Sequence, residues 1–144
     1  MRVLIVDDEP LARRFLAELL AEIPGVEIVG EAANGFEAVQ ATERLKPELL
    51  LLDIQMPKLS GFEVLELLGE AAPAVVFVTA YDEYALRAFE VHAVDYLLKP
   101  TSRERLAEAL NRARSRVGPR PRPAQLAASA WGFRCVFPST WIAA

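Results

Sequence analysis

The chain has 144 residues, of which 53% are hydrophobic and 25% are charged, which fits one folded domain and excludes a disordered chain. No apolar run reaches the about 18 residues that a membrane-spanning helix needs, and charges follow closely on the first apolar residues. We therefore expect neither a membrane span nor a signal peptide. The single cysteine, Cys135, excludes an internal disulfide and fits a reducing compartment, so we expect a cytoplasmic protein.

The composition changes near Gly118. All acidic residues lie before residue 109, whereas residues 118–144 carry three arginines, both tryptophans and no acid. The segment 118–125 is rich in proline and arginine, which is typical of a stiff linker. We therefore expect one domain over residues 1–117, followed by a Pro/Arg-rich linker and a short C-terminal tail over residues 118–144.

Strands and helices are predicted to alternate along residues 1–117. Short apolar or β-branched runs predict strands at residues 2–6, 26–30, 49–52, 74–78 and 93–98. Apolar residues at helical spacing predict a helix after each strand, with apolar sides running from Leu11 to Leu20, Phe36 to Leu45, Phe62 to Leu68, Tyr84 to Phe89 and Leu106 to Ala113. The expected helix starts are Asp7 or Asp8 with Pro10, then Asn34, Asp82, and Thr101 or Ser102.

Five β–α units of this kind predict an α/β fold. Alternating strands and helices form a parallel sheet with helices on both faces, and right-handed crossovers leave few possible topologies. We expect a (βα)5 doubly wound sheet with strand order 2-1-3-4-5, the flavodoxin-like arrangement.

Polar residues follow four of the predicted strands. Asp7 and Asp8 follow the first, Asp53 the third, Thr79 the fourth and Lys99 the fifth. Because parallel strands end at the same edge of the sheet, these side chains are expected to meet there, where ligands bind in open α/β sheets.

This set of side chains indicates phosphoryl chemistry. Clustered carboxylates repel, and a hard cation such as Mg²⁺, which binds carboxylate and phosphate oxygens, removes the repulsion. Asp53 is the expected nucleophile, which would form an acyl phosphate. Lys99 is suited to pair with the phosphoryl group, and Thr79 can donate a hydrogen bond to one of its oxygens.

Four segments resemble a bacterial response-regulator receiver domain. They are VDDEP (6–10), LLLLDIQMPKLSGFEVL (49–65), VTAYDEYALRAF (78–89) and AVDYLLKP (93–100). The last two are most like receivers of the LytTR-output (LytR/AlgR-type) subfamily. The resemblance covers about residues 1–117, and it implies a signalling domain that catalyses only its own phosphorylation and dephosphorylation.

The resemblance also implies roles for individual residues. Asp53 resembles the phosphoacceptor and a metal ligand, Asp8 the direct Mg²⁺ ligand and Asp7 the holder of a metal-bound water, and the main-chain carbonyl of Gln55 would complete the protein ligands. The remaining roles are a switch pair, a phosphate-pairing lysine and a cis-proline, which correspond to Thr79 with Tyr96, Lys99 and Pro100.

The implied partners are a histidine kinase and a second copy of the chain. Dimerisation is expected through the fourth helix, fifth strand and fifth helix, where Asp95, Arg105 and Arg112 offer opposite charges. The subfamily implies a DNA-binding output domain, for which residues 118–144 are too few, so DNA contact is expected only through a domain absent from this chain.

Two alternatives stay open and two are disfavoured. A stand-alone receiver, or a receiver-like module that works without phosphorylation, would keep this architecture. A haloacid-dehalogenase-type phosphohydrolase needs an acid two residues after its nucleophile, where this chain has Gln55. A dinucleotide binder needs a glycine-rich first turn, where this chain has Asp7 and Asp8.

Overall fold

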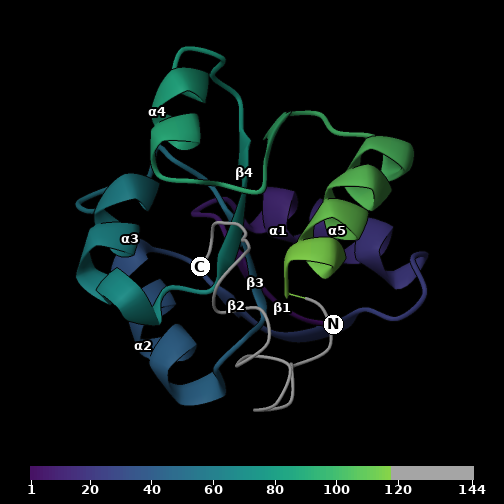
Figure 1. Cartoon of the computed structure of the whole chain (residues 1–144), viewed down its shortest axis with the longest axis horizontal. Helices are drawn as coiled ribbons and strands as arrows, with labels where there is room; N and C mark the ends of the chain where they lie inside the picture. Colours follow the sequence, from purple (N-terminus) through teal and green to yellow (C-terminus); the bar gives the residue numbers. More distant parts are fainter. Residues whose placement is uncertain (118–144) are drawn as a thin grey trace, which may run out of the picture.

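The computed structural model describes residues 1–117, in which five parallel strands form one sheet in the order β2-β1-β3-β4-β5 (Figure 1). The strands are β1 (Arg2–Val6), β2 (Glu27–Ala32), β3 (Leu49–Leu52), β4 (Ala74–Thr79) and β5 (Asp95–Leu98). The helices are α1 (Pro10–Ala21), α2 (Gly35–Leu45), α3 (Gly61–Leu68), the 3₁₀ turn η1 (Gly69–Ala71), α4 (Ala85–Glu90) and α5 (Arg103–Val117). The predicted fold class and strand order are confirmed, and the expected linker and tail lie outside the described residues.

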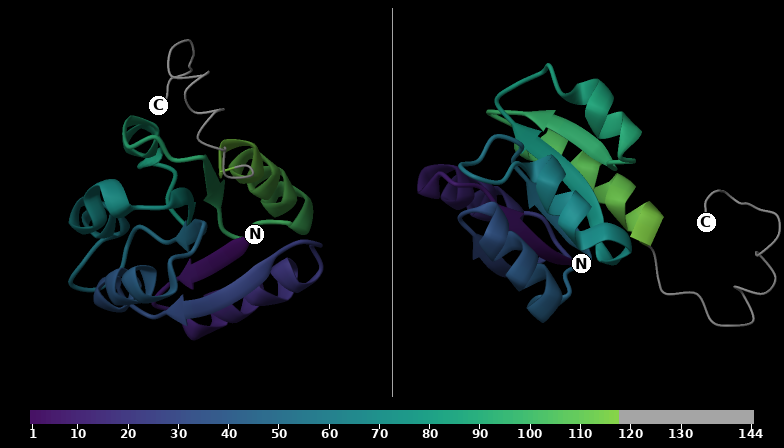
Figure 2. Two further views of the ribbon diagram at one scale, coloured as in Figure 1. Left: turned by 60° about the horizontal axis from the view of Figure 1, so that its bottom comes forward. Right: turned by 90° about the vertical axis from the view of Figure 1, so that its left-hand side faces the viewer.

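Helices cover both faces of the sheet. α2, α3 and α4 lie along one face, and α1 and α5 lie on the other (Figure 2). The four leucines of β3 explain why both faces must be covered, because Leu50 and Leu52 pack toward α2 and α3 while Leu49 and Leu51 pack toward α1 and α5. All four are fully buried, as expected for a central strand of a parallel sheet.

Side-chain caps begin three of the helices. The Asn34 side chain accepts a hydrogen bond from the Glu37 amide at the start of α2. Ser60 and Glu63 form a capping box at the start of α3, and the Ser102 hydroxyl accepts the Arg105 amide at the start of α5. These contacts satisfy amide groups that lack partners within the helix.

The start of α1 differs from the prediction that Asp7 or Asp8 caps it. Glu9 occupies the N-cap position without a side-chain bond, and Pro10 takes the first turn. The Asp7 carboxylate instead accepts the Glu9 amide at 2.9 Å and turns toward the sheet edge. The two aspartates are therefore available to the site at that edge.

Several boundaries and apolar faces also differ. β5 begins at Asp95 rather than residue 93, and α4 begins at Ala85 rather than Asp82, because the segment before Ala85 forms turns. Leu11, Phe15, Phe36 and Phe89, which were expected on apolar helix faces, are 78%, 43%, 56% and 78% exposed. The first three lie in the first two turns of α1 and α2, whereas Phe89 lies near the end of α4. Among residues 1–117, no helix combines the length and the apolar character needed to cross a bilayer.

Candidate functional site

The register of the central strands brings the first two carboxylates together. Val6 of β1 pairs with Leu52 of β3, so Asp7 and Asp53, one residue further on, lie side by side. The Asp53 amide donates to the Val6 carbonyl at 3.0 Å, which continues the pairing of the strands by one residue. The residues that directly follow these two strands, Asp7 and Asp53, thus lie at the base of the site.

Asp7, Asp8 and Asp53 form a compact carboxylate cluster. One carboxylate oxygen from each lies within 4.8 Å of the others. Asp7 and Asp53 are buried, at 1% and 6% exposed, and Asp8 is half-buried. Three acids this close, two of them removed from water, require a positive charge to remain ionised together.

Lys99 provides part of that charge. Its ammonium lies 2.6 Å from an Asp7 oxygen and 3.2 Å from an Asp53 oxygen, and Glu9 is 3.9 Å away. The residue is positioned by backbone pairing, since its amide donates to the Thr79 carbonyl at 2.8 Å. Burial would lower the pKa of Lys99, but its hydrogen bond with Asp7 and the charges of Asp53 and Asp7 outweigh burial and raise it.

The pKa of the Asp53 carboxyl is raised even though Lys99 lies beside it. Burial raises the pKa of Asp53, the Lys99 charge opposes the rise, and the negative charge of Asp7 adds to it. The net shift is upward, because burial of the carboxyl is the largest contribution.

The remaining oxygens fit a hard divalent cation. Within residues 1–117, the Asp8 carboxylate has no hydrogen bond or ion pair, and the Gln55 carbonyl accepts no hydrogen bond. Together with Asp53 they offer the all-oxygen donor set that Mg²⁺ prefers. A cation there would also offset the burial and the Asp7 charge that raise the pKa of Asp53.

Thr79 and Tyr96 lie on the neighbouring strands β4 and β5. Thr79 is fully buried at the end of β4, and its hydroxyl accepts the Tyr81 amide at 3.4 Å. The Tyr96 hydroxyl donates to the Tyr81 carbonyl. Both residues of the expected switch pair therefore contact one short segment after β4. The Lys99–Pro100 peptide bond, which follows β5, is cis.

Sequence reasoning missed two features around Asp53. A Cβ atom on Gly61 would lie 2.4 Å from the Asp53 carbonyl oxygen, so only glycine allows the start of α3 to approach Asp53 this closely. The Gln55 side chain donates to the Tyr84 hydroxyl at 2.8 Å. A glycine at a loop–helix junction is a weak signal for such an approach, and no sequence signal indicated the second contact.

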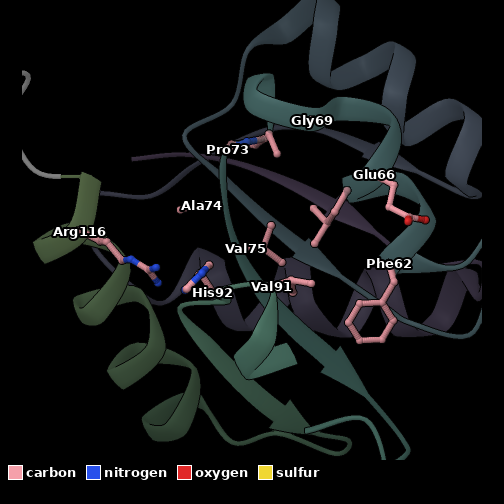
Figure 3. Close-up of a pocket in the computed structure, with 11 residues that line it drawn as sticks. Phe62, Glu66, Gly69, Pro73, Ala74, Val75, Val91, His92 and Arg116 are labelled. Atoms are coloured by element: carbon pink, nitrogen blue, oxygen red, sulfur yellow. The ribbon is translucent and has the colours of Figure 1, made fainter. Parts of the chain in front are cut away.

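Two surface hollows differ in their relation to this site. A groove of about 600 Å³ next to Lys99 is lined mainly by residues of α1 and of the segment after β5, including Leu11, Phe15 and Pro100. A second hollow, of about 540 Å³, lies at the opposite edge of the sheet, where Ala74 and Val75 begin β4 (Figure 3). It contains none of the clustered carboxylates, so of these two hollows the first adjoins the site.

Comparison with known proteins identifies similar chains. Residues 3–111 match the family described as the response regulator receiver domain. The transcriptional regulatory protein BtsR of Salmonella typhi is 55% identical over 115 residues, which are 79% of this chain and 48% of that protein. BtsR of Escherichia coli is 53% identical over 115 residues, with the same coverage of 79% and 48%. The chain thus spans about half the length of the curated relatives it matches.

A solved structure has the same fold. The crystal structure of the response regulatory domain of mrkE from Klebsiella pneumoniae superposes with a TM-score of 0.74 at 34% sequence identity. The match covers 81% of this chain and 98% of that domain.

Proposed function

Because the chain belongs to the response regulator receiver family, we propose that Asp53 accepts a phosphoryl group from a phosphohistidine of a histidine kinase in a Mg²⁺-dependent reaction. The observation that carries this proposal is the cluster of Asp7, Asp8 and Asp53 around the Lys99 ammonium. With a divalent cation bound to the carboxylates, such a cluster and the Lys99 ammonium would stabilise the negative charge on a transferring phosphoryl group.

Each residue of the site would have a separate role in this reaction. An Asp53 carboxylate oxygen attacks phosphorus, the phosphorus–nitrogen bond of the donor breaks, and the imidazole leaves with the bonding electrons. Asp8, Asp53 and the Gln55 carbonyl would hold Mg²⁺, and Asp7 would act through a metal-bound water. When bound, the ion neutralises charge on the phosphoryl oxygens. Lys99, already 3.2 Å from Asp53, pairs with one of these oxygens.

Thr79 and Tyr96 would convert this chemistry into a conformational change. The Thr79 hydroxyl can donate to a phosphoryl oxygen, which draws the end of β4 toward Asp53. Tyr96 contacts the Tyr81 carbonyl, two residues after Thr79, so displacement of that segment changes the environment of Tyr96. The phosphoryl group carries about −1.5 to −2 charges in place of the single negative charge of the carboxylate, and it adds acceptor oxygens that can bias a two-state element.

The groove beside Lys99 is our candidate for the kinase-binding surface. A protein that delivers a phosphoryl group must cover the mouth of the site, and Leu11 and Phe15 of α1 expose apolar surface there. Apolar side chains at an exposed patch are typical of a protein interface.

For output, we propose control of transcription through a LytTR-type DNA-binding domain outside this chain. The support is the subfamily resemblance together with the relatives named transcriptional regulatory proteins. We also propose dimerisation through α4, β5 and α5, with Leu86 and Phe89 as the apolar centre because they are 71% and 78% exposed. The expectation that Asp95 offers its charge to a second copy needs correction, since this carboxylate pairs with Arg105 and Arg112 of its own chain.

Intact-mass analysis tests the central proposal. Incubation with acetyl phosphate and Mg²⁺ should add one phosphate to the wild type and none to Asp53→Asn. Chelation of the metal should prevent the addition. A phosphate that is still added to Asp53→Asn would show that another residue is the acceptor.

A further inference from the structure

A hydrogen bond joins the loop after β3 to the start of α4. The Gln55 side-chain amide donates to the Tyr84 hydroxyl at 2.8 Å. Gln55 lies two residues after Asp53, and Tyr84 occupies the position directly before α4. This contact neighbours the bond between Tyr96 and Tyr81, because the rings of Tyr81 and Tyr84 lie 6.3 Å apart.

Aromatic packing fixes the Tyr84 ring beside α3. Its centroid lies 6.2 Å from that of Phe62, in the first turn of α3, and 6.3 Å from that of Tyr81, in an edge-to-face arrangement. The Arg87 guanidinium of α4 lies 4.2 Å from the Phe62 ring centroid. These contacts are geometrically favourable for aromatic pairs and for a cation over a ring, so they hold α4 against α3.

The start of α3 is in turn tied to the phosphoacceptor loop. The Gly61 amide donates to the Ile54 carbonyl at 2.9 Å, and Gly61 approaches the Asp53 carbonyl closely. Gln55 is thus part of a loop that is hydrogen-bonded to the start of α3, whereas Tyr84 belongs to the segment that begins at Thr79.

We infer that Gln55 and Tyr84 form a second link between the phosphoacceptor loop and α4, which holds α4 in its resting position in addition to the contact between Tyr96 and Tyr81. The inference rests on the proposed phosphorylation of Asp53. If Thr79 moves toward a phosphoryl group, the following residues up to Tyr84 move with it, while Gln55 stays with the metal-binding loop. The hydrogen bond is then broken in the phosphorylated state.

A contact that exists only in the resting state weakens the binding of any ligand that selects the other state. The apparent affinity falls by the factor with which the contact stabilises the resting state. For a hydrogen bond at an exposed position, we expect a factor of about 2 to 5. Removal of the Tyr84 hydroxyl should therefore raise the apparent affinity for a phosphoryl mimic by that factor.

The tyrosines of the chain provide a direct readout. All three, Tyr81, Tyr84 and Tyr96, lie in this region, so 3-fluorotyrosine labelling gives fluorine NMR signals from this region alone. We propose to titrate wild type and Tyr84→Phe with beryllofluoride in the presence of Mg²⁺ and to follow the Tyr96 signal. The expected result is a half-maximal change at about 2- to 5-fold lower beryllofluoride in Tyr84→Phe.

Tyr81→Phe is the matched control. Within residues 1–117 the Tyr81 hydroxyl makes no hydrogen bond, although its ring packs against Tyr84. This variant should titrate like the wild type. Gln55→Met, which keeps the side-chain length without the amide, should reproduce the shift of Tyr84→Phe, and the double variant should show no further shift, because both substitutions break one bond.

The outcomes separate the two proposals. Equal midpoints for wild type and Tyr84→Phe, equal shifts in Tyr84→Phe and Tyr81→Phe, or additive shifts in the double variant would each overturn the link while leaving phosphorylation of Asp53 intact. A wild type whose signals do not respond to beryllofluoride, and whose mass does not increase with acetyl phosphate, would overturn the proposed function and the link together.

Discussion

Asp95 offers the sharpest test of how charge is used on the face formed by β5 and α5. Its side chain is only 8% exposed, and its oxygens accept hydrogen bonds from Arg105 at 2.8 and 2.7 Å and from Arg112 at 2.6 Å. The Tyr96 amide also donates to it at 2.8 Å. Asp95→Ala removes all of these acceptors at once.

The expected loss of stability is about 3 kcal/mol. The two-pronged bond with the Arg105 guanidinium contributes about 1.5 to 3 kcal/mol, and the amide of Tyr96 contributes about 1 kcal/mol. The Arg112 side chain is 58% exposed, so we expect less than about 1 kcal/mol from its pair with Asp95. For a domain of this size, the total corresponds to a fall of about 10 °C in the melting temperature.

The pH dependence adds a second, independent check. Burial alone would raise the pKa of Asp95, but the hydrogen bonds from Arg105 and the Tyr96 amide and the charges of Arg105 and Arg112 outweigh it and lower the pKa. Stabilisation by a carboxyl with a lowered pKa is complete above the unfolded-state pKa of about 3.9 and is lost as the pH falls through the folded-state value. The stability difference between wild type and Asp95→Ala should therefore shrink below about pH 4.

Chemical denaturation from pH 3 to pH 7 measures both quantities, and Arg112→Ala is a mild control because its side chain is largely exposed. A loss below about 0.5 kcal/mol at pH 7, or a difference that does not change down to pH 3, would refute the reasoning. The contacts of Asp95 also affect how the proposed dimer is tested. Because Asp95→Arg breaks contacts within one chain, Phe89→Ala is the cleaner variant for testing the proposed dimer interface by light scattering.

Three further predictions concern the metal, the kinase and the core. In calorimetric Mg²⁺ titrations, Asp8→Ala should weaken binding more than Asp7→Ala, because Asp8 has no other partner within residues 1–117; equal losses would contradict the ligand roles. Leu11→Asp should slow phosphoryl transfer from a kinase but not from acetyl phosphate, whereas Leu67→Asp on α3, also exposed, should slow neither; a slowed acetyl phosphate reaction would place the defect in the site. Thr42→Val should raise the unfolding free energy by about 1 kcal/mol, because the buried Thr42 hydroxyl has no hydrogen-bond partner within residues 1–117. A clear fall in the melting temperature of this variant would show that the hydroxyl has a partner.

The sequence alone was sufficient for the architecture because the pattern is local. The run Leu49–Leu52 has no polar face, so it predicts a strand covered on both sides, and the structure confirms this. Alternation of strands and helices then limits the sheet to a parallel order. That order alone places the residues after β1 and β3 side by side, which is why the sequence by itself predicts that Asp7 and Asp53 are neighbours.

The tertiary structure decided which partner each long or polar side chain takes. Lys99 lies closer to Asp7 than to Asp53, Asp95 is enclosed by two arginines of α5, and Gln55 reaches Tyr84 across 29 positions of sequence. Apolar periodicity predicts that one face of a helix is buried, but it failed for Leu11 in the first turn of α1 and for Phe89 near the end of α4, which are both 78% exposed. Backbone pattern depends on neighbours in the sequence, whereas side-chain pairing depends on distances that arise only after the elements have packed.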